Sequence, residues 1–155
     1  MKRIFTLLLA AVMLVAFTAC GAPAKTEKPG DKLELSELMQ TILKDVELPA
    51  VGDIEITKDN FSSFLFIDYI DGAQALASEG LINAVAHSVV LLRVPDGVDA
   101  AKTAADIEKN ADPRKWICVE AEKTIVKQYN NTILLVMSFA DTTDQIAKNF
   151  DSLYA

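Results

Sequence analysis

The sequence contains very few of the residues that usually bind metals or form cross-links. Cys20 and Cys118 are its only cysteines, and His87 is its only histidine. A structural zinc site needs four cysteine or histidine ligands, so composition alone excludes this class of site. A disulfide within one chain would need both cysteines as thiols, and the argument below removes Cys20 from that pool. We expect no metal and no cofactor, and a fold whose stability comes from its apolar core.

Clusters of basic residues are also lacking. The formal net charge is −7, and no run of three lysines or arginines occurs anywhere in the chain. Proteins that bind nucleic acid need a clustered basic surface to neutralise phosphates, so we expect no nucleic-acid partner. Adhesion to an anionic bilayer through a basic face is excluded by the same composition.

The sequence begins with an apolar run that is too short to span a membrane as a helix. Residues 4–17 carry no charge and follow Lys2 and Arg3, but a spanning helix needs about 20 apolar residues. A short apolar run after a basic start is typical of a secretory signal peptide, which we assign to residues 1–19.

The end of this run, Phe17-Thr18-Ala19-Cys20, resembles the lipobox of bacterial lipoproteins. The resemblance implies cleavage just before Cys20 and a diacylglycerol on its sulfur, with the mature protein held to the extracytoplasmic face of the cell membrane. Phe17 departs from the family, which usually has an aliphatic residue there. The alternative is an ordinary secreted protein that is cut near Ala19 or Ala22. Acyl chains stabilise membrane binding by about 0.8 kcal/mol per buried methylene, so two chains anchor firmly.

The next segment, 20–32, is rich in Gly, Pro, Ala and charged residues and has no apolar period. This composition predicts a disordered tether that follows the lipidated cysteine. Residues 33–155 then form one domain of ordinary size. Loss of Lys2 and Arg3 with the signal makes the mature chain two charges more negative.

Apolar residues recur at three- and four-residue spacing in 33–49, which predicts an amphipathic helix with Ser36 as its cap and Pro49 beyond its end. Its apolar face is expected to pack in the core, with a partner-binding helix as the alternative. Residues 50–53 look like a turn. Asp59 or Asn60 is expected to cap a short helix.

The segment 66–81 is ambiguous, because its alanines suit a helix whereas their alternation suits a strand; we favour the strand. A buried strand is expected at 87–95, followed by a helix from Val98 that ends at Asp112-Pro113.

Two strands are expected around a turn at Asn130-Asn131, and a last helix capped by Asp141 or Thr142. This order predicts a single α+β domain with an antiparallel or mixed sheet and helices packed on one side of it.

The opening helix, the VVLLRV strand, the WICVEAEKTIVKQYNNTILLVMS segment and the terminal helix together resemble the DUF4358 family of bacterial lipoproteins, over residues 33–155. The resemblance implies a lipoprotein domain of this kind. That family has no established activity, so it implies no catalytic residues.

Few residues suggest chemistry. Asp68 and Asp71 lack the spacing of a calcium loop, so they are expected in a solvated turn. His87 and Ser88 are adjacent on a strand and should point to opposite faces, which argues against a catalytic pair. We expect His87 to be partly buried and structural. Cys118 is expected to be a buried, inert thiol, with an exposed thiol that forms a disulfide dimer as the alternative.

The remaining candidates are aromatic and basic. Core packing is expected for Trp116, Tyr129 and Phe139, with an apolar groove as the alternative, and Arg114 with Lys115 could face an anionic ligand. No residue is assigned a catalytic role, and Cys20 is the one assigned site. The sequence therefore favours a membrane-anchored, non-enzymatic module that binds an envelope protein or a small ligand, with an envelope-associated enzyme as the alternative.

Overall fold

The computed structural model describes residues 26–155. The assigned signal peptide, Cys20 and the first part of the expected tether lie outside these residues. The elements in chain order are η1 (Pro29–Lys32), α1 (Leu35–Leu43), β1 (Val51–Glu55), α2 (Phe61–Leu65), β2 (Gln74–Gly80), β3 (Ser88–Arg93), α3 (Ala100–Asn110), β4 (Lys123–Tyr129), β5 (Thr132–Ser138) and α4 (Ala140–Ser152).

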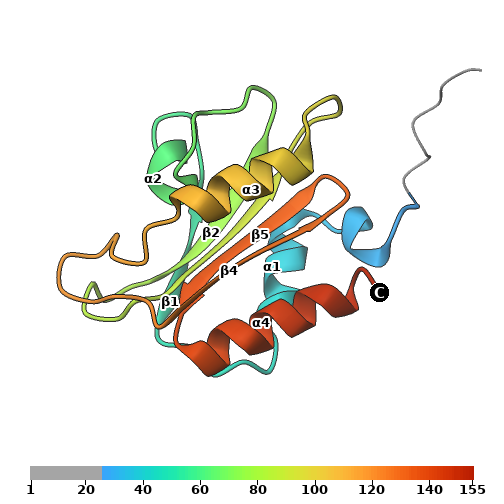
Figure 1. Cartoon of the computed structure of the whole chain (residues 1–155). Helices are drawn as coiled ribbons and strands as arrows, with labels where there is room; N and C mark the ends of the chain where they lie inside the picture. Colours follow the sequence, from blue (N-terminus) through green and yellow to red (C-terminus); the bar gives the residue numbers. More distant parts are fainter. Residues whose placement is uncertain (1–25) are drawn as a thin grey trace, which may run out of the picture.

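The five strands form one antiparallel sheet in the order β1-β2-β3-β5-β4, which confirms the α+β class. The expectation of helices on one side of the sheet is wrong. In Figure 1, α2 and α3 cover one face, and α1 and α4 cover the other. The reason lies in two of the inner strands, β3 and β5, whose central residues are apolar on both faces. A strand without polar residues on either face must be buried on both.

Two hydrophobic clusters result, one on each face of the sheet. Val90 and Leu92 of β3 face the cluster beneath α2 and α3, whereas Val89 and Leu91 face the cluster beneath α1 and α4. These alternating residues place both halves of the core on the same strand. β3 is therefore the centre of the domain.

The predicted first helix is confirmed, but its cap and its end differ from the prediction. Ser36 lies inside α1 and is exposed, and Glu34 precedes the first turn. α1 ends at Leu43, where Lys44 becomes extended and Asp45 then adopts a left-handed conformation with φ of 58°. The following residues Val46 and Leu48 then pack as extended chain against the α1 and α4 cluster. Their spacing had resembled a continuation of the helix.

The turn expected at 50–53 is wrong, because these residues begin β1. Val51 pairs with Gly80 and Glu55 pairs with Leu76 at the edge of the sheet. β1 has only two large apolar residues, so its sequence carries little strand pattern. The neighbouring segment is strand, as favoured: β2 buries Ala77 on one face and Ser78 on the other.

The hairpin around Asn130-Asn131 is confirmed. Tyr129 pairs with Thr132, and Asn130 has the positive φ, 48°, that such a turn requires. The caps predicted for the last helix are wrong. The Ala140 N–H at the start of α4 donates to Glu122 Oε2 (3.0 Å), so neither Asp141 nor Thr142 caps it.

The expected short helix is confirmed as α2, with Asn60 at its N-cap position. The Asn60 side chain does not cap it, because its Oδ1 accepts from the Thr57 N–H (2.7 Å). The helix expected after Val98 is also confirmed, and Asp99 caps α3 by accepting the Lys102 N–H (2.9 Å).

The disorder expected throughout 20–32 is wrong for the last part of that segment, which packs on the domain as η1. The Gly30 N–H donates to the Leu153 carbonyl (3.2 Å), and Arg93 Nη2 donates to the carbonyls of Gly30 (3.3 Å) and Leu33 (3.0 Å). A Cβ on residue 30 would lie 2.4 Å from the Tyr154 ring. This glycine is a close-packing residue rather than a sign of flexibility.

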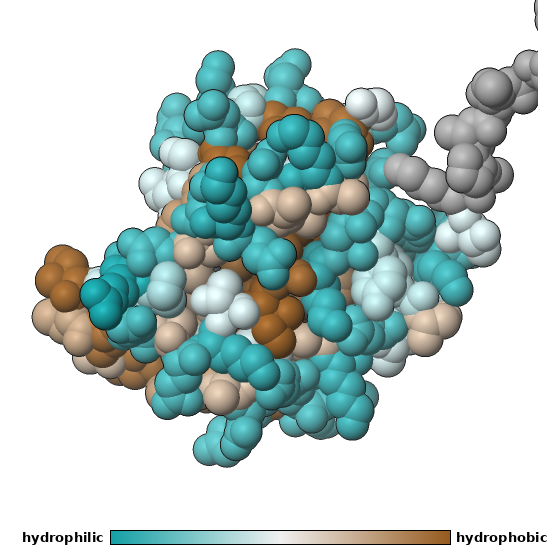
Figure 2. Space-filling view, in the orientation of Figure 1, coloured by the Kyte–Doolittle hydropathy of each residue, from teal (hydrophilic) through white to brown (hydrophobic). Residues whose placement is uncertain are grey.

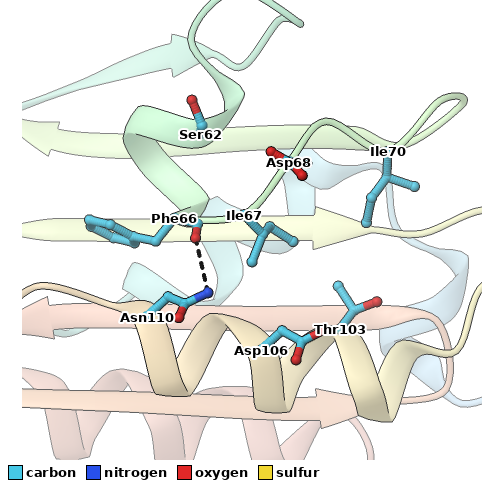
Figure 3. A pocket seen from close by; sticks show the side chains of 8 residues that line it. All are labelled: Ser62, Phe66, Ile67, Asp68, Ile70, Thr103, Asp106 and Asn110. Atoms are coloured by element: carbon cyan, nitrogen blue, oxygen red, sulfur yellow. Dashed lines mark hydrogen bonds between the residues drawn. The ribbon is translucent and has the colours of Figure 1, made fainter.

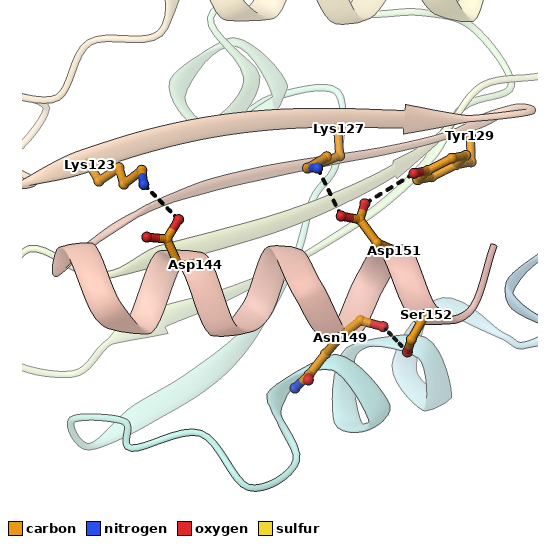
Figure 4. A network of polar contacts seen from close by, with 7 residues as sticks. All are labelled: Lys123, Lys127, Tyr129, Asp144, Asn149, Asp151 and Ser152. Carbon is orange, nitrogen blue, oxygen red and sulfur yellow. Dashed lines mark hydrogen bonds and ion pairs between the residues drawn. The ribbon is translucent and has the colours of Figure 1, made fainter. Parts of the chain in front are cut away.

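Polar contacts fix α4 along the outer strand β4 (Figure 4). Lys123 Nζ donates to Asp144 Oδ1 (2.6 Å) at one end of the helix. Near the other end, Asp151 accepts from Lys127 Nζ (2.9 Å) and from the Tyr129 hydroxyl (3.1 Å). Both lysines of β4 therefore have an anionic partner within the domain.

Candidate functional site

Two loops of the domain lie side by side at one end of the sheet. Residues 81–87 connect β2 to β3, and residues 111–122 connect α3 to β4. The strand register places them together, because Glu79 pairs with Ser88, Ser88 with Met137, and Lys123 with Ser138. In Figure 1 both loops project at the left, away from η1. We call this end the loop end, and we call the opposite end, with η1 and the β4–β5 turn, the hairpin end.

Large apolar side chains are exposed at the loop end. Leu81, Ile82, Ile117 and Phe139 are between 44% and 99% exposed, with Ile117 at the upper limit. Figure 2 shows hydrophobic atoms on the projecting loops at the left of the molecule. We call these four residues the loop-end patch. Among residues 26–155, only Ile54 and Tyr69 are comparable exposed apolar side chains outside it. Exposed apolar side chains that gather at one end of a domain are a candidate interaction surface.

Beneath these loops lies a buried ion pair. Lys115 Nζ lies 2.9 Å from Glu79 Oε1, and the two side chains are each 13% exposed. Lys115 Nζ also donates to Ser88 Oγ (2.9 Å), and the Ser88 hydroxyl donates to Glu79 Oε1. Burial lowers the pKa of Lys115, and the nearby Glu79 opposes this effect. The pair ties the 111–122 loop to β2 and β3.

Aromatic rings complete the surroundings of Lys115. Its ammonium lies 5.0 Å from the centre of the Phe64 ring and 5.2 Å from that of the Trp116 ring. A cation at this distance from an aromatic ring is attracted to it, more strongly when both are shielded from water. The loop is therefore held at its base while its tip, Ile117, projects into solvent.

His87 and Ser88 lie on opposite faces of β3, as predicted. His87 is fully buried, and its Nδ1 lies 2.9 Å from Ser138 Oγ, whereas its Nε2 has no hydrogen-bond partner among the described residues. Burial, with a smaller contribution from the Lys115 charge, lowers its pKa to about 4. The imidazole is therefore neutral at pH 7, and it cannot reach the Ser88 hydroxyl through the sheet. This arrangement does not form a nucleophile and base pair.

One prediction about the 111–122 loop is wrong, and one candidate site is not formed. Cys118 is exposed rather than buried, because the loop turns its tip into solvent. Arg114 and Lys115 do not form a joint anion site, since Arg114 pairs with Glu120 (3.0 Å) and Lys115 is buried against Glu79.

The three aromatic candidates do not come together. Trp116 packs on the α2 and α3 cluster, and Phe139 is exposed at the loop end. Tyr129 lies at the hairpin end, where its ring stacks on Tyr154 with the centres 4.9 Å apart. Core packing is thus confirmed for Trp116 and Tyr129 and is wrong for Phe139.

A separate surface pocket of about 620 Å³ lies between α2 and α3 (Figure 3). Carboxylates, hydroxyls and apolar side chains share its lining, in which Asn110 Nδ2 donates to the Phe66 carbonyl (3.3 Å). Lys102, outside the lining, pairs with one of the carboxylates, that of Asp106 (2.5 Å). The lining has no cation to hold an anionic ligand and no nucleophile beside a base. It consists of Ser62, Phe66, Ile67, Asp68, Ile70, Thr103, Asp106 and Asn110.

Asp68 and Asp71 are exposed in the segment between α2 and β2, which agrees with the predicted solvated turn. Within residues 26–155, no group of three histidine, cysteine or acidic side chains is arranged to hold a metal ion.

Sequence reasoning missed Glu79, which is the ion-pair partner of Lys115. The two are 36 positions apart in the chain, on β2 and in the loop before β4. No local spacing could signal their contact, because the sheet and the α3 connection bring them together.

Comparison of the chain with family models, with curated proteins and with solved structures gave no match. Within the part of the chain that the structure describes, no helix is both long and apolar enough to cross a bilayer.

Proposed function

We propose that this protein is a membrane-anchored lipoprotein of the extracytoplasmic face, held by a diacylglycerol on Cys20, and that its domain is a non-enzymatic binding module. The lipobox-like segment Phe17-Thr18-Ala19-Cys20 supports the anchor. The loop-end patch is the observation that carries the binding function. The resemblance of residues 33–155 to the DUF4358 family belongs to the same proposal.

The position of the patch relative to the start of the domain supports this arrangement. Thr26 lies at the hairpin end, where its carbonyl accepts from Asn130 Nδ2 (3.3 Å). The six residues of β3 span about 20 Å between the two ends, at about 3.3 Å per residue. A lipid at Cys20 therefore attaches to the domain at the end opposite the loop-end patch. The patch is left free for a partner.

The polar groups beneath the patch support binding rather than catalysis. The Ser88 hydroxyl is buried and hydrogen-bonded to Glu79 and Lys115. His87 is buried on the other face of the sheet. Among the groups that the loop end offers to solvent are four large apolar side chains, which favour association with another apolar surface.

The anchor is tested by metabolic labelling with radioactive palmitate. Cys20→Ala should abolish the label and leave an unprocessed precursor, because no sulfur remains to accept the lipid. Cys118→Ala is the matched control, since it removes the other cysteine and should keep the label. Label that survives in Cys20→Ala would refute the anchor, and so would loss of label in Cys118→Ala alone.

An envelope-associated enzyme remains the second candidate, because Lys115 Nζ lies 2.9 Å from Ser88 Oγ. A lysine of lowered pKa beside a serine hydroxyl is one way to activate a nucleophile. A fluorophosphonate probe tests this role directly. Stoichiometric labelling that is lost in Ser88→Ala would favour the enzyme, and absence of labelling would favour the binding module.

A further inference from the structure

We propose that the loop-end patch docks on an envelope protein whose contact surface has an apolar centre bordered by lysine and arginine side chains. This inference rests on the proposed function, and it deepens that function by naming the surface and the chemistry of the partner. Three features of the loop end carry it: exposed apolar side chains on a fixed backbone, an excess of acidic groups that have no ion-pair partner, and a position opposite the anchor.

The loops that carry the patch are held in shape before any partner binds. The 81–87 loop is closed by backbone hydrogen bonds, in which Leu81 N–H donates to Ala50 (2.8 Å) and Val85 N–H to Ile82 (3.0 Å). The 111–122 loop is tied down by the buried pair of Lys115 and Glu79. A surface that is already ordered loses little conformational entropy on binding, so its apolar area contributes more fully to affinity.

The charges around the patch favour a basic partner. Each cation of the 111–122 loop and of the first residues of β4 and α4 is already paired: Arg114 with Glu120, Lys115 with Glu79, and Lys123 with Asp144. Three acidic residues of the same segments have no ion-pair partner among residues 26–155, and these are Asp112, Glu122 and Asp141. The rim of the patch is therefore negative.

A negative rim distinguishes among the possible occupants. A second copy of the chain would bring two negative rims together, and an anionic bilayer would repel the rim. A protein with basic residues around an apolar centre is attracted instead, and complementary charge at a rim speeds association and selects the partner.

The place of the anchor agrees with this choice. The segment between Cys20 and Thr26 is only a few residues long, and even fully extended it adds at most about 3.6 Å per residue. The anchored hairpin end stays close to the membrane surface, and the loop end lies farther out. The patch therefore faces other envelope proteins rather than the bilayer to which the domain is attached.

The experiment places a photo-crosslinking amino acid at Ile117 in the full lipidated chain in its own membrane. The same group at Glu37, which is exposed on α1, is the matched control. A protein captured from Ile117 and not from Glu37 is identified and purified. Its affinity for the full chain in lipid nanodiscs is then measured for wild type and variants.

Ile117→Ser should weaken binding about tenfold, because a central apolar contact is lost. This variant should fold normally, since Ile117 is 99% exposed. Asp141→Lys should weaken binding about threefold and reduce its dependence on salt, whereas Glu37→Lys should leave both unchanged. The adducts on the partner should map to apolar residues with lysine or arginine neighbours.

Several outcomes would overturn the inference. Adducts from Ile117 with lipid alone would show that the patch meets the bilayer, and adducts with a second copy would show self-association. Tighter binding by Asp141→Lys would refute the basic partner. Capture of a protein from Glu37 but not from Ile117 would reject this surface and leave the proposed binding function standing. Capture from neither position would count against both.

Discussion

The two ends of the sheet use their side chains in opposite ways. At the hairpin end, Arg93 donates hydrogen bonds to backbone carbonyls of Gly30 and Leu33, and Tyr129 stacks on Tyr154. Polar and aromatic groups there contact other parts of the domain. At the loop end, the polar groups Lys115 and Glu79 are buried and the apolar side chains are exposed. The hairpin end has the pattern of a surface built for stability. The loop end has the pattern of a surface built for contact, with a polar clamp beneath it that keeps its shape.

The largest effect on stability is expected from the clamp at the loop end. Lys115→Met should lower the free energy of unfolding by about 3 kcal/mol, because it leaves the Glu79 carboxylate buried without its cation. Chemical denaturation monitored by circular dichroism measures this change. Lys123→Met is the matched control. Its ion pair with Asp144 is 39% and 57% exposed, so the loss should stay below about 1 kcal/mol.

The double variant Glu79→Gln with Lys115→Met should recover part of that loss, since no buried charge remains. Equal losses for Lys115→Met and Lys123→Met would contradict the clamp, because the buried and the exposed ion pair would then contribute alike.

The next largest effect concerns pH and the buried His87. Its pKa is about 4 in the folded protein and about 6.5 when unfolded, so the unfolded chain binds the proton more tightly. Stability is therefore full above pH 6.5 and falls as the pH drops toward 4, by at most about 3 kcal/mol. Denaturation at several pH values checks this.

His87→Gln serves as the control, because it removes the titrating ring. The carboxylates that titrate in the same range are common to both proteins, so the difference between the two pH profiles isolates His87. Parallel profiles between pH 6.5 and 4 would contradict the buried, neutral imidazole.

A smaller effect is expected at the hairpin end from Gly30→Ala. The added methyl would lie 2.4 Å from the Tyr154 ring, so η1 or the ring must move, at a cost of about 2 kcal/mol. Denaturation gives the energy, and limited proteolysis should reveal faster cleavage within 26–33. Ser36→Ala, at an exposed position of α1, should change neither the free energy of unfolding nor the rate of cleavage. Unchanged proteolysis in Gly30→Ala would mean that η1 is not fastened as described.

The smallest effect on folding is expected from the patch itself. Ile117→Ser should change the free energy of unfolding by less than about 0.5 kcal/mol, because the side chain is exposed already. Ile107→Val, which removes one methyl from a fully buried residue, should cost about 1 kcal/mol. A larger loss for Ile117→Ser would mean that the loop tip packs in the domain, and the contrast between the two ends would fail.

The sequence predicts the helices, strands and turns that are determined by residues close together in the chain. The apolar runs of β3 and β5, the Asn130-Asn131 turn and the apolar period of α1 all lie within short windows, and the structure confirms each of them. The face of α1 that was expected to be buried is buried, with Leu38, Met39 and Ile42 almost fully covered. The apolar runs of β3 and β5 could also have predicted helices on both faces of the sheet. A strand that is apolar on both faces must be buried on both.

What the sequence could not predict depends on residues that are distant in the chain. Glu122, in the loop before β4, accepts the first N–H of α4, so the local candidates Asp141 and Thr142 were wrong. β1 has too few apolar residues to be recognised without its partner β2. Cys118 sits in an apolar-looking stretch, but its loop is shaped by the ion pair of Lys115 and Glu79. These contacts exist only once the sheet has formed.

The tryptophan and two of the tyrosines lie at opposite ends of the domain. Trp116 is the only tryptophan of the chain, and it lies in the 111–122 loop beside the Lys115 ammonium. Two of the three tyrosines, Tyr129 and Tyr154, are stacked at the hairpin end. Excitation at wavelengths that only tryptophan absorbs will therefore report on the loop end alone, without any added label. Intrinsic tryptophan fluorescence thus provides a direct optical signal for occupancy of that surface.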